Sequence, residues 1–448
     1  MNPSSHSRRQ FLHGSAALLI ASRLPAILQA APAADLREAA VEMAVAELWR
    51  RFVMPAHGTI LHYTGLKGEV IIPTAEECAA LRPNGGGWMT PIEDGPMFGG
   101  LLLDGLCNRW RKLRTAESAA QARRIAHGLV KLAQAGRTPG FVARGLTVDG
   151  KAHYPGTSED QTLPWFYGLW RYVRSGLPEA AEKKELIDLM EKTALALEGH
   201  GWQIPCDPIS FGYRGNYIRA KHIDAARLLF LHRALYDLTG HDRWLERYRS
   251  VASEVIGDER RSRRDWCAVG MDYVSPSIPT YDFKGTASVS QKLWTSSMSQ
   301  AALRGLWEME TDEDWRRGYR RGLLINARNA IVHLARHRRL EEGDKLTFDI
   351  DWHFLLPSWK PQANCDEAIL LMRTQLPLWG SHNPRSVWED DTVREPLFAA
   401  WIVTLAGDPE IMRECRDEID RMLGHYRWDQ LYTSLFFAAV CVHYQPQN

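Results

Sequence analysis

Apolar residues recur at helical spacing along almost the whole chain. A clear example, with gaps of three and four residues, is the set Leu228, Leu231, Leu235 and Leu238. This period places apolar side chains on one face of an α-helix. Strand-like segments are rare and short, chiefly residues 69–72 and 346–350. The pattern predicts an all-α protein, with a first helix over residues 35–52 and a last one over residues 431–442.

Five short joints between helices contain the same kinds of helix-ending and helix-capping residues. In these joints Gly, Ser, Thr or Asp ends one apolar run and caps the next, and Pro follows in two of them. The joints lie at residues 114–117, 175–178, 239–242, 311–314 and 406–409. A helix, a tight turn and a second helix therefore form a unit that recurs loosely along the chain.

Long connections join these hairpins to one another. They cover residues 81–98, 136–158, 201–216, 257–289, 341–364 and 379–391. An open α-solenoid would have short, even loops and would be a binding scaffold. Long loops on one side only favour a closed ring of six hairpins, an (α/α)6 barrel. In such a ring all long connections emerge at the same end, and loops of this length are usually functional, so we expect the site there.

The composition excludes several classes of partner. The 448 residues carry a formal net charge of +1, so no global field attracts nucleic acid or an anionic membrane. Seven cysteines are scattered without a CxxC pair, which argues against a zinc site and a disulfide scaffold, and their spacing does not indicate a pair. No linker divides the chain. We predict one domain over residues 34–448, no metal, no cofactor and no nucleic-acid partner.

The N-terminal segment resembles a twin-arginine export signal. Ser7-Arg8-Arg9-Gln10-Phe11-Leu12 precedes a short apolar run that is broken by Arg23 and Pro25. That run is too short for a membrane-spanning helix. Ala31-Pro32-Ala33 fits a small-x-small cleavage site. We therefore expect residues 1–33 to be a removable signal read by the twin-arginine translocase, with no membrane anchor, and the mature protein to be periplasmic or secreted.

Aromatic residues are concentrated in or beside the long connections. They are Trp88, Tyr154, Trp202, Tyr213, Tyr217, Trp266, Tyr273, Tyr281, Trp352, Trp359, Trp379 and Trp388. Aromatic faces stack on the apolar faces of sugar rings, and the alternative role is core packing under the loops. We predict that Trp88, Tyr154, Trp266, Trp352 and Trp388 contact a carbohydrate.

Two acidic groups are candidates for catalysis. Glu159 and Asp160 open an aromatic helix after Ser158, where Ser158 and Gln161 would form a capping box. Burial would raise the pKa of one of these carboxyls toward that of a general acid. Asp390 lies in the last long connection and is the predicted partner carboxylate; the alternative is a solvated turn capped by Asp391. Glycoside hydrolysis needs such a pair on opposite sides of the scissile bond.

A cationic and phenolic cluster precedes an apolar helix near residue 222. Its members are Arg214, Asn216, Tyr217 and His222. Arg214, with Arg144, could grip a uronate carboxylate in bidentate fashion. Tyr217 and His222 could instead serve as base and acid in β-elimination. Further candidates for binding at the mouth of the ring are Gln161, His57, His62, His153, His353 and His382.

On these residues the chain resembles the six-hairpin glycosidase superfamily, in particular unsaturated glucuronyl hydrolases and related bacterial enzymes that act on uronic-acid sugars. The resemblance covers residues 35–442 and rests on the architecture and the Ser158-Glu159-Asp160-Gln161 segment. It implies an (α/α)6 barrel in which Asp160 is the general acid. Similar barrels also house polysaccharide lyases and sugar epimerases.

We therefore predict a periplasmic glycoside hydrolase that cleaves uronic-acid-containing oligosaccharides, with Asp160 as proton donor and Asp390 or Glu159 activating water. The first alternative is a lyase of the same fold that uses Tyr217, with His222 or Asn216 assisting. The second is a glycan-binding protein without catalytic activity.

Overall fold

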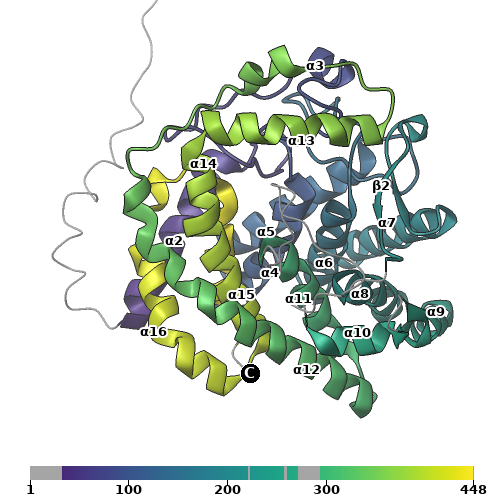
Figure 1. Ribbon diagram of the computed structural model, residues 1–448. Helices are drawn as coiled ribbons and strands as arrows, with labels where there is room; N and C mark the ends of the chain where they lie inside the picture. The colour runs from purple at the N-terminus through teal and green to yellow at the C-terminus, as the bar shows by residue number, and fades with distance from the viewer. Residues whose placement is uncertain (1–32, 220–221, 257–259, 271–292, 447–448) are drawn as a thin grey trace, which may run out of the picture.

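The computed structural model describes residues 33–446, apart from residues 220–221, 257–259 and 271–292. Within these residues, six inner helices pack side by side in a closed ring, each against the next and the last against the first (Figure 1). They are α4 (Gly95–Leu113), α6 (Glu159–Ser175), α8 (His222–Thr239), α11 (Leu293–Met309), α15 (Glu395–Ala406) and α17 (Ala438–Tyr444). The predicted (α/α)6 barrel is confirmed, and the open solenoid is excluded.

An outer layer of helices covers the ring. Its members are α2 (Ala33–Glu47), α5 (Ala116–Gln134), α7 (Ala180–Gly199), α9 (Asp242–Ser253), α12 (Glu313–Ala330) and α16 (Pro409–His425). Every residue of α15 is buried, whereas α16 buries one face through Ile411, Cys415 and Ile419. This difference follows from position, because an inner helix has neighbours on all sides and an outer helix has solvent on one.

The two ends of the described chain meet in the ring. α2 continues into a π-helical turn η1 (Leu48–Phe52) and packs on α17, which follows the 3-10 turn η7 (Ser434–Phe437). Both predicted terminal helices are thus present. None of the described helices combines the length and the apolar character needed to cross a membrane.

The five predicted short joints are all turns between an inner and an outer helix. α4 ends at Arg114 and α15 at Gly407, both in left-handed geometry. The side chains of Thr115 and Asp408 then accept backbone N–H groups of the next helix. These local caps explain why the joints could be predicted from sequence. Because the first five inner helices end at short joints, their N-terminal ends face the long connections.

The predicted strand-like segments are not strands. Residues 69–72 and 346–350 are irregular, and their apolar side chains pack into two small clusters, Val70 and Ile72 in one and Ile71, Phe348 and Ile350 in the other. Neither segment has a neighbouring strand to pair with. The described strands form two hairpins, β1 (Gln203–Pro205) with β2 (Tyr213–Asn216), and β3 (Val255–Ile256) with β4 (Arg261–Ser262).

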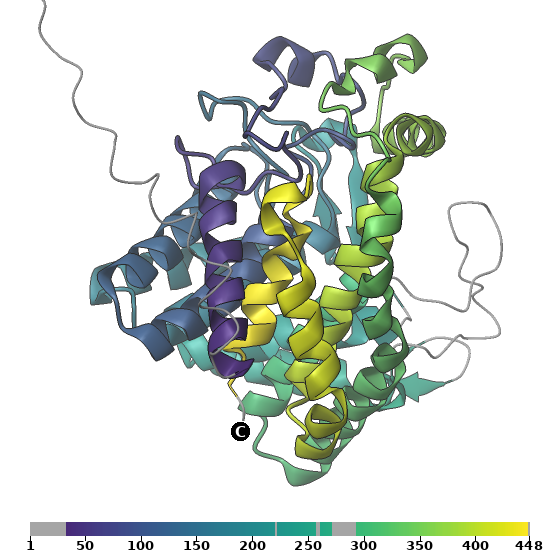
Figure 2. The ribbon, with the colours of Figure 1, turned by 90° about the vertical axis from the view of Figure 1, so that its left-hand side faces the viewer.

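Long connections gather at one end of the barrel, at the top of Figure 2. Outside the ring, the connections between hairpins contain further helices, from the three-residue η2 to the 18-residue α13: α3 (Ala75–Ala79), η2 (Ile209–Phe211), α10 (Arg263–Val269), η3 (Ile331–Gly343), η4 (Trp352–Ser358), α13 (Cys365–His382), α14 (Pro384–Glu389), η5 (Asp390–Arg394) and η6 (Trp428–Gln430). Of these, α3 and α13 lie along the top of Figure 1 and form part of the rim. The connection around residues 257–289 lies mostly outside the described residues.

Helices α4 and α6 approach so closely that glycines form the contact. A Cβ added to Gly100 would lie 2.0 Å from the carbonyl oxygen of Pro164, and one added to Gly168 would lie 2.4 Å from that of Gly100. Both obstacles are backbone atoms, which cannot rotate away. This contact fixes the relative position of two inner helices whose N-terminal ends carry acidic residues.

Replacing Gly100 by alanine is therefore expected to lower the free energy of unfolding by about 3 kcal/mol, because the helices must separate. The matched control is Gly424→Ala in α16, where an added Cβ meets nothing within 4 Å. There the better helix propensity of alanine should stabilise the protein by about 1 kcal/mol. Thermal denaturation of both variants measures the difference, and equal melting temperatures would contradict the described packing.

Candidate active site

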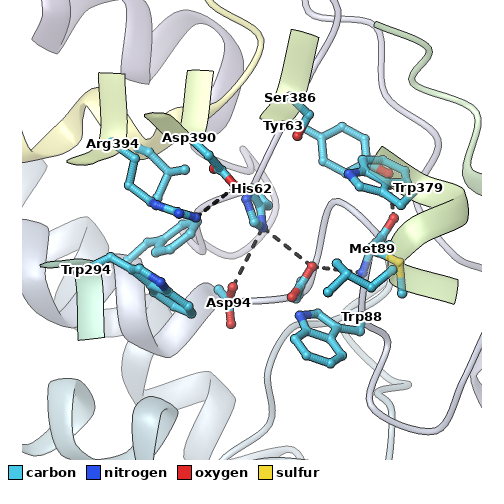
Figure 3. A pocket seen from close by; sticks show the side chains of 14 residues that line it. His62, Tyr63, Trp88, Met89, Asp94, Trp294, Trp379, Ser386, Asp390 and Arg394 are labelled. Carbon is cyan, nitrogen blue, oxygen red and sulfur yellow. Dashed lines mark hydrogen bonds and ion pairs between the residues drawn. The ribbon is translucent and has the colours of Figure 1, made fainter. Parts of the chain in front are cut away.

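A cavity opens at the N-terminal ends of the inner helices. Its space, counted together with the solvent at its open mouth, is about 700 Å³. Figure 3 shows the residues that line it. Its charged lining consists of His62, Glu93, Asp94, Asp390 and Arg394, and its aromatic lining of Tyr63, Trp88, Phe98, Trp294 and Trp379. The charged residues come from segments far apart in sequence. A cavity with aromatic walls and a few convergent charged groups is typical of a ligand site.

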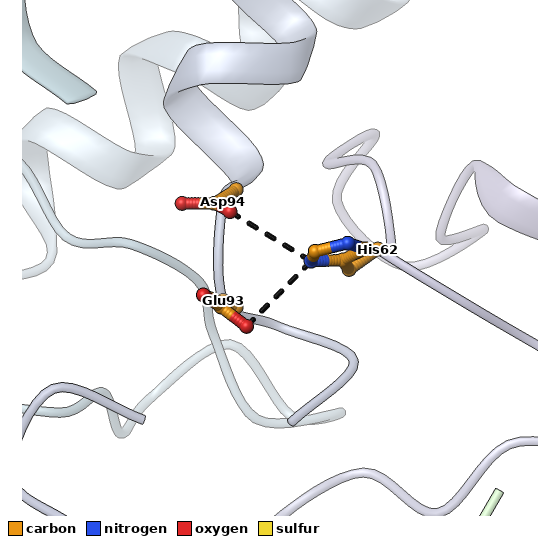
Figure 4. A group of neighbouring side chains, drawn as sticks. All are labelled: His62, Glu93 and Asp94. Carbon is orange, nitrogen blue, oxygen red and sulfur yellow. Dashed lines mark ion pairs between the residues drawn. The ribbon is translucent and has the colours of Figure 1, made fainter. Parts of the chain in front are cut away.

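His62 faces two carboxyl groups at the start of α4 (Figure 4). Its Nδ1 atom lies 3.6 Å from Oε2 of Glu93 and 3.7 Å from Oδ2 of Asp94. Burial and the neighbouring charge of Asp94 raise the pKa of Glu93. Burial opposes protonation of His62, but Glu93, Asp94 and Asp390 raise its pKa above the ordinary value. Glu93 and His62 therefore hold a proton more readily than they would in water.

Asp94 is fixed by two donors. Arg144 Nη1 donates to Asp94 Oδ1 at 2.9 Å, and Gln161 Nε2 donates to the same atom at 2.6 Å. Arg144 also donates to Ser158 Oγ at 3.1 Å. The predicted capping box is therefore wrong: Ser158 occupies the N-cap position without a side-chain cap, because its hydroxyl and Gln161 are engaged across the helix interface. Arg144 and Gln161 hold a carboxylate of the protein in this structure.

Asp390 also lines the cavity, where it lies near His62 (Figure 3). It forms an ion pair of 2.9 Å with Nη1 of Arg394, whose Nε donates to Glu395 at 3.0 Å. Burial opposes the charge of Arg394, but Asp390 and Glu395 raise its pKa. The guanidinium also lies 5.4 Å from the ring centre of Trp294. Asp391, next in sequence, turns away and pairs with Arg336 at 2.7 Å. The π-helical turn η5 separates these neighbouring acids.

Glu159 and Asp160 lie at the start of α6, as predicted, but neither lines the cavity. Asp160 is ion-paired with Arg227 at 2.9 Å, and its side chain is 30% exposed. Glu159 is ion-paired with Arg219 at 3.1 Å and lies against the backbone of Gly215. These paired acids belong to the rim beside the cavity.

The structure does not bring the described members of the cationic and phenolic cluster to one site. Arg214 lies beside the cavity wall, with its guanidinium 5.5 Å from the ring centre of Trp88. Its Nη1 atom is buried and has no hydrogen-bond partner, and burial, followed by repulsion from Arg144, lowers its pKa to about 10. Asn216 accepts the N–H of Ile218 within the turn after β2.

The other two members of this cluster cannot be assigned to the cavity. Tyr217 is fully buried, its hydroxyl shares a 2.5 Å hydrogen bond with Thr162 Oγ1, and burial raises its pKa. This corrects the expectation that Tyr217 meets a substrate. The side chain of His222 lies outside the described residues.

Six predicted binding residues do not line this cavity, and their predicted contact with a carbohydrate stays a prediction. Four are aromatic residues engaged in packing: Trp266 donates to Ile256, Trp352 to Ile71, Trp388 to Leu340 and Tyr154 to Arg82. The other two are histidines in ion pairs, His153 with Asp207 and His353 with Glu77 and Asp351. Each indole and phenol uses its polar atom on a backbone carbonyl, which is typical of an aromatic residue that supports a loop. Tyr273 and Tyr281 lie outside the described residues.

The sequence patterns do not single out four charged residues that line the cavity. Glu93 and Asp94 lie inside the connection over residues 81–98, of which only Trp88 was selected, and Arg394 was not selected at all. The available signal was the pair Glu93-Asp94 directly before Gly95-Pro96, since an acid before a helix with Pro at its first turn marks an N-terminus. His62 was one of several candidates without a distinguishing feature.

His62, Glu93 and Asp94 also have the composition of a metal site. One ligand atom from each lies within 4.8 Å of the others. One imidazole nitrogen and two carboxylate oxygens suit Zn²⁺ or Mn²⁺. These side chains also have charge partners without a metal ion, because His62 lies beside Glu93 and Arg144 forms an ion pair with Asp94. The chemistry proposed below therefore assigns no step to a metal.

Comparisons with known proteins give remote structural likenesses. A sugar epimerase from a ruminal bacterium has a TM-score of 0.41 and 12% sequence identity, over 77% of this chain and 86% of the epimerase. A family 76 glycoside hydrolase from a bovine Bacteroides thetaiotaomicron strain has a TM-score of 0.41 and 11% identity, over 93% of this chain and 78% of the hydrolase. No protein-family model and no curated protein matches the chain.

Proposed function

We propose that this protein is a glycoside hydrolase whose active site is the cavity at the mouth of the barrel. The observation that carries the proposal is a set of carboxyl groups in unlike environments within one aromatic-walled cavity. Glu93 is buried and has a raised pKa, whereas Asp390 is ion-paired with Arg394 and partly exposed. Where two carboxyl groups lie in different environments, the one with the higher pKa can act as the general acid and the other as the base or nucleophile.

In this mechanism Glu93 donates a proton to the glycosidic oxygen as the bond to the sugar breaks. Burial and the charge of Asp94 favour the protonated form of Glu93, whereas His62, which lies against it, acts in the opposite direction. Asp390, which is ion-paired with Arg394, acts on the opposite side of the sugar by activating water or by attacking the anomeric carbon. Asp94, held by Arg144 and Gln161, supplies negative charge near the cationic transition state. Trp88, Trp294 and Trp379 offer faces for sugar rings.

The proposed substrate class is an oligosaccharide that contains a uronic acid. Arg214 supports this choice, because its guanidinium lies on Trp88 and makes no ion pair within the described part of the chain. Arg214 is half-buried, and its buried Nη1 atom has no hydrogen-bond partner, which costs free energy that a substrate carboxylate would offset. Export through the twin-arginine pathway, with action in the periplasm or outside the cell, remains part of this proposal.

The described tyrosines do not favour the lyase alternative. The phenol of Tyr217 is enclosed, and the hydroxyl of Tyr63, the tyrosine that lines the cavity, donates to the carbonyl oxygen of Met89 at 3.0 Å. A base for β-elimination must reach the proton that it removes. The proposed function therefore rests on the carboxyl groups of the cavity and not on a tyrosine.

Incubation with a panel of uronate oligosaccharides and their lyase digests tests the function. A hydrolase releases reducing ends, and one that cleaves unsaturated uronates also removes their ultraviolet absorbance. A lyase would instead create that absorbance. Binding measured by calorimetry without any product would indicate a glycan-binding protein. Either of these last two results would overturn the proposal.

Replacing Arg214 by methionine is expected to lower kcat/KM for a uronate substrate by about 10- to 100-fold, since a hydrogen bond to a charged group is lost. The melting temperature should stay the same or rise, because an unpaired buried charge is removed. The matched control is Arg219→Met, which removes an exposed cation from the same segment. Equal losses on uronate and neutral substrates would argue against a role for Arg214 in recognising the carboxylate.

A further inference from the structure

Two cysteines lie at the junction of two segments that shape the mouth of the barrel. Cys206 directly follows β1, and Cys365 is the first residue of α13. Both side chains are buried, and together with Phe211 and Ala368 they form a small cluster separate from the main core. The segments are therefore joined at this point by only a few apolar contacts.

The two thiols are neighbours in this cluster. Cys206 lowers the pKa of the Cys365 thiol, against the effect of burial. The positive charge of Arg214 acts in the same direction. The first turn of α13 adds the partial positive charge of a helix N-terminus. A thiolate is the form of cysteine that attacks disulfides, so Cys365 is the reactive member of the pair.

We propose that Cys206 and Cys365 are a redox-sensitive pair that closes into a disulfide bond when the protein meets an oxidising environment. The Cys365 thiolate attacks a disulfide-bonded oxidant, such as oxidised glutathione, and displaces one thiol. The Cys206 sulfur then attacks the mixed disulfide and displaces the second. Two protein thiols lose two protons and two electrons, and one oxidised glutathione becomes two reduced molecules.

The bond would tie the rim of the cavity together. α13 contributes Leu376 and Trp379 to the cavity wall, and β2 carries Arg214. A cross-link between residues far apart in sequence stabilises mainly by restricting the unfolded chain. This inference does not depend on the glycosidase proposal, because it concerns only the chemistry of the two thiols.

The full-length purified protein can be incubated with oxidised glutathione, both folded and during refolding from urea, and compared with protein kept in dithiothreitol. Mass spectrometry of a non-reducing digest is expected to show the peptides of Cys206 and Cys365 joined. The melting temperature should rise by about 5 °C on oxidation. Hydrogen exchange at the start of α13 should slow.

Single variants Cys206→Ser and Cys365→Ser should lose both the linked peptide and the rise in melting temperature. Cys78→Ser is the matched control, since Cys78 is a buried thiol whose hydrogen-bond neighbour is Tyr154. It should retain both effects. Two results would overturn the inference: Cys206 and Cys365 both remaining open to alkylation after oxidative refolding, or a bond formed between other cysteines.

Discussion

Replacing Glu93 by glutamine is expected to lower kcat/KM on the cleaved glycoside by about 10³-fold, because the amide cannot donate a proton to the leaving oxygen. Glutamine has nearly the same shape, and its carbonyl oxygen can still accept the N–H of Met89, which donates to Glu93 at 2.8 Å. The fold around the start of α4 should therefore persist. Steady-state kinetics with the substrate found in the panel measures the loss.

A matched control for this variant is Glu77→Gln. Glu77 lies in α3 at the same end of the barrel, pairs with His353 outside the cavity, and caps its helix in a way that glutamine also permits. We expect kcat/KM to change less than about threefold there, in line with a surface substitution away from the chemistry. Similar losses in the two variants would remove Glu93 from the mechanism.

The pH dependence of the Glu93 variant provides a second readout. Because the pKa of Glu93 is raised in the fold, its protonated form persists above the range of an ordinary glutamic acid, which is about pH 4.3. The native state then binds more protons than the unfolded state, so this group's contribution to stability falls as pH rises through the raised pKa. The glutamine in Glu93→Gln cannot ionise. As pH rises across that window, the melting temperature of the variant should therefore increase relative to that of the wild type.

Much of the fold could be predicted because its signals are local. The caps and glycines at joints such as Thr115 and Gly407 act within one turn of helix. The closed ring followed from the uneven lengths of the connections. The segments over residues 69–72 and 346–350 failed because a strand exists only with a partner, which an alternating pattern does not supply. The short strands that do form are hairpins within the loops.

The site was predictable only in its general position. Two acidic pairs, Glu93-Asp94 and Glu159-Asp160, both lie at the start of inner helices, and their local sequence marks the helix start without showing which pair faces the cavity. Folding places His62 against the first pair and arginines against each member of the second. The difference between a reactive acid and a paired one is thus set by distant residues. The same holds for Trp266 and Trp352, whose loops fold inward onto the body of the protein.

The neighbouring residues Asp390 and Asp391 offer the sharpest internal comparison. Asp390 lines the cavity and is held by Arg394, whereas Asp391 is held by Arg336 outside it. Replacing Asp390 by asparagine removes the negative charge that activates water or attacks the anomeric carbon. We expect kcat/KM to fall by about 10³-fold, with a smaller change in KM, because the charge acts chiefly in the transition state.

Asp391→Asn removes the same charge from the next position in sequence. It breaks a partly exposed ion pair, so we expect a stability loss of at most about 1 kcal/mol and nearly unchanged kcat. If both variants lose activity equally, the acidic segment acts through the general field of its charges rather than through one carboxylate. A loss confined to Asp391→Asn would place the reacting group outside the cavity. Only a large loss at Asp390 alone agrees with a carboxylate that faces Glu93 across a bound sugar.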